Sequence, residues 1–216
     1  MRIVIRQRLP DAPSHPLPLC VRPARLRVSN RPARVLGFDI ENRPLSYLGS
    51  DFTTAEVTAI AWAWTDSPRV TVRLLGEHDL PDILREFVAA FEQADMVTGH
   101  YITGHDLPMI NGALMECRMA PLPPKMVSDT KVHLIRSKGL SMSQESLGAM
   151  FRLDAQKVSM NQIKWRAANR LTKAGLAEVR KRVVGDVRQH IALRRELLAC
   201  GYLAAPRLWK SGAGEA

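Results

Sequence analysis

Short apolar runs bounded by turn residues occupy much of the chain between residues 35 and 100. Runs of this kind, about four to eight residues long and rich in β-branched and aromatic side chains, are typical of buried strands. Asn42-Arg43-Pro44 ends the first run, and the turn residues Asp66-Ser67-Pro68 separate two later ones. The pattern predicts strands over Val35–Glu41, Val57–Trp64, Val70–Leu75 and Met96–Gly99, and a further short strand near Val127.

Helical spacing of apolar residues appears between and after these runs. After Asp79, a suitable N-cap, apolar residues from Leu80 to Phe91 recur three and four positions apart and form one stripe. We predict three more helices: one that begins near Leu107-Pro108, one that begins with the capping box of Ser141 and Gln144 and reaches Met150, and one from about Leu176 to Cys200. The last helix should turn inward Val179, Val183, Val187, Ile191 and Leu198.

The order of these elements indicates the fold class. Three strands in a meander are followed by alternating helices and strands, which favours an α/β fold with a mixed sheet flanked by helices. The 216 residues suffice for one sizeable core. We assign residues 34–216 to this domain and residues 1–33 to a basic, proline-rich arm that is extended or disordered.

The charge of the chain is unevenly distributed. Its net charge is +10. The segment before the first core strand contains one acid, Asp11, and many arginines: Arg2, Arg6, Arg8, Arg22, Arg25, Arg27, Arg31 and Arg34. A basic balance suits a polyanion such as nucleic acid, although a soluble basic protein can carry the same charge. The three cysteines form no CxxC pair, so we expect a reducing compartment and a cytoplasmic protein. No apolar run approaches the ~18 residues of a membrane span, so we expect no membrane contact.

Two acids stand close together in the first predicted strand. Side chains alternate faces along a strand, so Asp39 and Glu41 point to the same side and Ile40 to the other. Neighbouring carboxylates repel each other, and a divalent cation between them would keep both ionised. The alternative is a strand that ends in solvent with two ordinary surface acids.

Two further acids occupy positions that could complete such a site. Asp106 stands at a helix start just after a strand, where ligands gather in open α/β sheets, but it could also be a plain N-cap. Asp186 lies inside the last helix, beside Val183 and Val187 of the inward stripe. Its alternative interpretation is a boundary aspartate paired with Arg182 one turn earlier.

Taken in order, these motifs resemble those of the DEDD 3′–5′ exonucleases, the proofreading branch of the ribonuclease H-like superfamily. Phe38-Asp39-Ile40-Glu41 matches the first motif, His105-Asp106-Leu107-Pro108 the second and Gly185-Asp186-Val187 the third. The resemblance runs from Ala33 to Trp209 and extends to stand-alone, phage-type members. It implies a ribonuclease H-like fold and a site of four catalytic acids that hold two Mg²⁺ or Mn²⁺ ions: Asp39, Glu41, Asp106 and Asp186.

The chain departs from the family at the residue that assists the attacking water. The family usually has a tyrosine four residues, or a histidine five residues, before the last aspartate, and here those positions are Arg182 and Lys181. Neither is a good general base at neutral pH. Three replacements are possible: His190 one helical turn after Asp186, His105 in the second motif, or the bound metal alone, which lowers the pKa of water. Apart from such a role, we expect His190 to be a solvated surface histidine.

The resemblance therefore implies a metal-dependent 3′–5′ exonuclease that hydrolyses phosphodiester bonds by a two-metal-ion mechanism. Its expected partner is a single-stranded 3′ end, with DNA favoured over RNA. The alternative of another class is a nucleic-acid-binding module of the same fold that has lost catalysis. Loss of the usual base favours that alternative, whereas retention of all four acids opposes it, because clustered carboxylates without metal destabilise a site. A structure-selective endonuclease on this fold is a third possibility.

Overall fold

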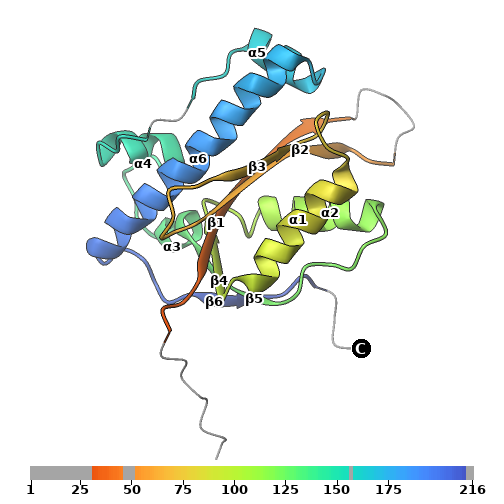
Figure 1. The fold of residues 1–216 in the computed structure, drawn as a ribbon. Coiled ribbons are helices and arrows are strands. Elements are labelled where there is room, and N and C mark those ends of the chain that lie inside the picture. Colours follow the sequence, from red (N-terminus) through yellow and green to blue (C-terminus); the bar gives the residue numbers. More distant parts are fainter. Residues whose placement is uncertain (1–30, 46–51, 156–157, 213–216) are drawn as a thin grey trace, which may run out of the picture. The chain divides into compact units, whose positions relative to one another are not determined.

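A computed structural model describes residues 31–45, 52–155 and 158–212 of the chain. The predicted arm over residues 1–33 lies outside this range except for its last three residues, and the boundary after residue 33 stays a prediction. From Ala33 onward the described residues form one compact unit in which a sheet separates two layers of helices (Figure 1).

In the described residues, the sheet has six strands in the order β3-β2-β1-β4-β5-β6. Neighbours β1, β4 and β5 run parallel, and the other pairs are antiparallel. The predicted α/β fold, with a meander followed by parallel strands, is therefore confirmed and is consistent with a ribonuclease H-like architecture. The strands are β1 (Val35–Pro44), β2 (Ala55–Trp64), β3 (Thr71–Leu74), β4 (Met96–Gly99), β5 (Lys125–Asp129) and β6 (Arg207–Trp209), the last of which was not predicted.

The first strand is longer than predicted, because Asn42-Arg43-Pro44 does not end it. The pairing with β2 shifts register between Glu41 and Asn42 and then continues to Pro44 opposite Ala55. Proline is tolerated at a strand end, where its missing N–H costs little. The Arg43 guanidinium also anchors this segment through an ion pair of 2.6 Å with Glu56.

Within the described part of the chain, six helices accompany the sheet. Helices α1 and α2 pack on one face, and α6 crosses the other face together with its neighbours α4 and α5 (Figure 1). The predicted helix after Asp79 and the long C-terminal helix are confirmed, the latter beginning three residues earlier than predicted. The bounds are α1 (Leu80–Gln93), α2 (Asp106–Glu116), α3 (Thr130–Leu134), α4 (Gln144–Met150), α5 (Gln162–Asn169) and α6 (Lys173–Ala199).

The two faces of the central strands differ in side-chain size. On the face toward α1 and α2, the buried Phe38 and Trp62 pack against Phe87, with ring centroids 5.1 and 5.8 Å apart. On the face toward α6, β2 contributes Ala59, Ala61 and Ala63 to the core, and a Cβ added to Gly37 would lie 3.1 Å from Ile191. Small residues thus let α6 approach the sheet closely, and this is the face to which Asp39 and Glu41 point.

Helix α6 is buried on two sides, which corrects the predicted inward stripe. One side packs on the alanine face of the sheet and the other on α4, where Leu193 and Leu197 are buried. Leu198, predicted to point inward, is 48% exposed. A single stripe cannot describe a helix that is held between two partners. None of the described helices is long and apolar enough to cross a membrane.

The predicted capping box at Ser141 is wrong by two residues. Helix α4 begins at Gln144, and its N-cap is Ser143, whose Oγ accepts a hydrogen bond of 3.1 Å from the Ser146 amide. Ser and Thr at this position satisfy an amide that the helix itself leaves without a partner. The serine pair Ser141 and Ser143 explains the error, because both precede a helix-like pattern.

We expect Ser143→Ala to lower the free energy of unfolding by about 1 kcal/mol, since the Ser146 amide loses its acceptor. Ser141→Ala is the matched control, and its effect should stay within about 0.5 kcal/mol as for other exposed positions. Urea denaturation of both variants measures the difference. A larger loss for Ser141→Ala would contradict the assignment of the cap.

Candidate metal centre

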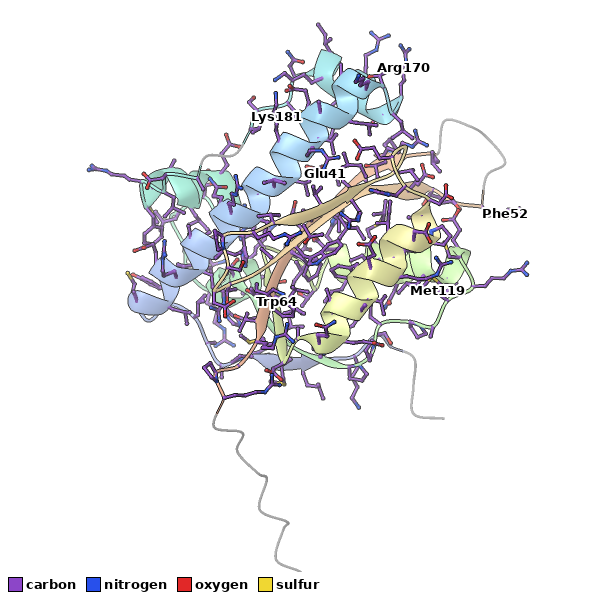
Figure 2. The ribbon with its side chains drawn as sticks, viewed as in Figure 1. Glu41, Phe52, Trp64, Met119, Arg170 and Lys181 are labelled. Atoms are coloured by element: carbon purple, nitrogen blue, oxygen red, sulfur yellow. The ribbon has the colours of Figure 1, made fainter. Side chains whose placement is uncertain are left out.

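Three of the four predicted acids converge on the α6 face of the sheet. Asp39 and Glu41 come from alternate positions of β1, and Asp186 comes from the middle of α6. One carboxylate oxygen of each lies within 4.8 Å of the other two. Figure 2 shows Glu41 beside α6 and Lys181 on the other flank of that helix.

Asp186 is 3% exposed, and its segment of α6 is fixed from a second helix. The Gln144 side-chain amide donates to the Asp186 carbonyl at 2.8 Å and to the Gln189 side chain at 3.2 Å. Sequence reasoning gave Gln144 only the role of a helix start. No signal in the sequence gave its partner on α6.

Asp106 is buried but has a different position from the other three acids. It is the first residue of α2, the N-cap position is occupied by His105, and Asp106 Oδ1 accepts from the Ile40 amide at 3.2 Å. The interpretation of Asp106 as an N-cap is therefore wrong. Among the described residues it is not part of the close group of acids. It instead contacts the backbone of β1 between Asp39 and Glu41.

The loop that leads to Asp106 is held by a buried aspartate of β5. Asp129 accepts from the amides of Tyr101 and Thr103 at 2.9 and 3.0 Å, and it also caps α3 through Lys131 and Val132. Tyr101 has a φ of 75°, which is costly for a residue with a Cβ. These hydrogen bonds hold the loop in that conformation and thereby fix the start of α2 beside β1.

Arg182 enters the group of acids from α6. Its Nε lies 2.6 Å from Glu41 Oε1 and 3.8 Å from Asp186 Oδ2. The alternative in which Asp186 pairs with Arg182 is thus partly met, although the shorter contact is to Glu41. The guanidinium also donates to the Val158 carbonyl at 2.9 Å and lies 5.2 Å from the Trp165 ring. Sequence reasoning missed Val158 and Trp165.

His190 is not the surface histidine that we expected. It is 1% exposed, and its Nε2 lies 3.0 Å from Thr98 Oγ1, whose hydroxyl donates to the Ser128 carbonyl. Nε2 must therefore carry the proton, and Nδ1 has no hydrogen-bond partner among the described residues. Burial lowers the pKa of His190 from 6.5 to about 3, and the positive charges of His100 and Arg194 add to this effect. His190 is a neutral core residue.

His105 has the opposite environment. About half of its side chain is exposed, and its Nδ1 lies 3.5 Å from Asp106 Oδ2. The hydrogen bond to Asp106 raises the pKa of His105, and the charges of Asp106 and Glu41 act in the same direction although partial burial opposes them. Of the two histidines among the three predicted replacements for the usual base, His105 is therefore the one beside the acids.

The group of Asp39, Glu41 and Asp186 fits a divalent cation. Carboxylate oxygens are the ligands that Mg²⁺ and Mn²⁺ prefer, and three of them lie close enough to share one ion. Like charges at this separation repel strongly where water is excluded, and Asp186 is almost fully buried. A cation at this position would offset that repulsion.

Comparisons with known proteins identify the fold but no family. No family model matches the chain, and no curated protein matches it. Among solved structures, the chain is similar to the family B DNA polymerase from the hyperthermophilic archaeon Pyrobaculum calidifontis, with a TM-score of 0.63 and 19% sequence identity. The match covers 78% of this chain but 25% of the polymerase chain. At this identity the likeness concerns the fold alone.

Proposed function

We propose that this protein is a metal-dependent 3′–5′ exonuclease that hydrolyses phosphodiester bonds of nucleic acid. The observation that carries the proposal is the convergence of Asp39, Glu41 and Asp186 from two distant segments, with ligand oxygens within 4.8 Å of one another. The order of the acid motifs, which resembles that of the proofreading exonucleases, and a fold like that of one part of a DNA polymerase support the same conclusion.

The proposed roles of the acids follow from their positions. Asp39, Glu41 and Asp186 would hold Mg²⁺ or Mn²⁺ through carboxylate oxygens, and Asp106 supports the site from α2 by accepting a hydrogen bond from the Ile40 amide of β1. A bound divalent cation supplies Lewis-acid polarisation of the phosphate and lowers the pKa of water. Gln144 keeps Asp186 in place by binding its carbonyl oxygen. His105 is the candidate for proton transfer, because it stands beside Asp106 and is open to solvent.

The substrate proposed here is a single-stranded 3′ end, with DNA favoured over RNA. The net charge of +10 suits a polyanion, since basic residues gain from neutralising phosphates. The neighbour in fold is a DNA polymerase, which supports DNA as the first substrate to test.

The decisive experiment follows 3′-labelled and 5′-labelled single-stranded oligonucleotides with Mg²⁺, with Mn²⁺ and with EDTA. We expect rapid release of the 3′ label as mononucleotide, a ladder of shortened 5′-labelled products, and no reaction in EDTA. Internal cuts in a circular single strand would favour the endonuclease, and release of the 5′ label first would contradict the proposed polarity.

A specific observation supports the second candidate, a nucleic-acid-binding module without catalysis. Arg182 stands where the family has its tyrosine, and its guanidinium binds Glu41 at 2.6 Å. Arginine cannot accept a proton at any ordinary pH. Binding of both oligonucleotides in a mobility-shift assay, without cleavage under either metal, would establish this candidate in place of the exonuclease.

A further inference from the structure

Arg182 is fixed inside the group of acids by contacts from several segments. Its side chain is 16% exposed, and Nε donates to Glu41 Oε1 at 2.6 Å. Nη1 donates to the Val158 carbonyl at 2.9 Å, and the guanidinium lies 5.2 Å from the ring centroid of Trp165 on α5. A planar guanidinium held by two hydrogen bonds and an aromatic ring has little freedom to leave.

The charge of Arg182 changes what the acids can bind. The three clustered carboxylates carry three negative charges when ionised, and a guanidinium stays protonated at all ordinary pH values. Arg182 places its charge against Glu41 and close to Asp186, so that a second divalent cation beside Glu41 would meet a fixed positive charge. The Glu41 oxygen nearest to Arg182 is also occupied as an acceptor.

We propose that Arg182 is an internal cation that takes the place of one of the two divalent ions, so that the centre binds one Mg²⁺ or Mn²⁺ instead of two. The inference rests on the proposed function, because it concerns the same acids. It deepens that function by assigning to the arginine the electrostatic role of one metal ion, while the three acids would still hold the other ion.

Calorimetric titration with Mn²⁺ of the full chain, with nucleic acid absent, tests the inference. We expect one ion for each wild-type chain and two ions for each chain of Arg182→Gln, which loses the internal charge. Arg182→Lys keeps the charge and should bind one. Lys181→Gln is the matched control, since it removes a charge from the exposed flank of the same helix, where Lys181 contacts Glu178. It should bind one ion with affinity unchanged within about twofold, because exposed charges are well screened.

Two results would overturn the inference. The first is a wild-type chain that binds two ions, and this result does not depend on whether any variant folds. The second is a folded Arg182→Gln variant that still binds one ion. Electron paramagnetic resonance of bound Mn²⁺ checks the count, because two ions that share ligands broaden each other's spectra. A wild-type chain that binds no ion at all would contradict the proposed function itself, whereas two ions together with metal-dependent cleavage would leave that function standing and remove only the role of Arg182.

Discussion

Replacing Asp39 by asparagine is expected to lower the rate of metal-dependent oligonucleotide cleavage by roughly a thousandfold, equivalent to about 4 kcal/mol of transition-state stabilisation. Asp39 lies on the strand face toward α6, in the group that also contains Glu41 and Asp186. An amide keeps the size of the side chain but removes one of the negative charges that attract the cation. Single-turnover cleavage of a 3′-labelled strand in Mn²⁺ measures the loss.

The same substitution should not destabilise the protein, and this separates a functional role from a structural one. An amide of the same size removes one of three clustered like charges and keeps the packing, so thermal unfolding in EDTA should stay close to the wild-type temperature. Asp82→Asn is the matched control, because Asp82 is an exposed acid paired with Arg85 on α1. An Asp39→Asn variant with a tenth or more of the wild-type rate would place the chemistry elsewhere.

Asp106 can be tested in the same assay by separating its charge from its hydrogen bond. Asp106→Asn retains an oxygen that can accept from the Ile40 amide, whereas Asp106→Ala leaves that amide without its 3.2 Å partner. We expect both variants to cleave more slowly, and the alanine variant also to lose stability by about 1 to 3 kcal/mol. Wild-type cleavage by Asp106→Asn would leave Asp106 with a purely structural role.

The positions of the acids were predictable because they depend on local rules. Alternation along β1 fixed the common face of Asp39 and Glu41, and the apolar spacing in α6 brought Asp186 close to its inward side. Both rules concern neighbours in sequence. They gave the correct elements and the fold class that those elements imply, whereas the family resemblance implied that the acids share one site.

The errors occur where contacts between distant segments decide. The Arg182 contact with Glu41 joins β1 to α6, and no local pattern predicts which side chain fills the space between them. His190 was expected at the surface, but α4 and the end of β4 cover that side of α6 and bury it. Leu198 was misplaced for the same reason, because the second buried side shifts the inward positions by one residue.

The buried His190 predicts a loss of stability in mild acid. Its folded-state pKa is lowered to about 3, first by burial and then by His100 and Arg194, against an ordinary value of 6.5. At pH values between these two pKa values, His190 is protonated in the unfolded chain and neutral in the folded chain. The folded state therefore keeps its full stability above pH 6.5 and loses it as the pH falls below 6.5, by up to about 1.4 kcal/mol for each pH unit.

Urea denaturation at pH 7.5 and pH 4.5 measures this loss. We expect the free energy of unfolding of wild type to fall by about 2 to 3 kcal/mol more than that of His190→Gln, whose amide can still donate to Thr98 but does not titrate. His78→Gln replaces an exposed histidine and should keep the wild-type fall. The comparison uses the difference between the two pH values, so a general destabilisation by the glutamine cancels. Equal falls in wild type and His190→Gln would show that this histidine is protonated in the folded protein, and the hydrogen bond from its Nε2 to Thr98 would then have to coexist with a charged ring in the core.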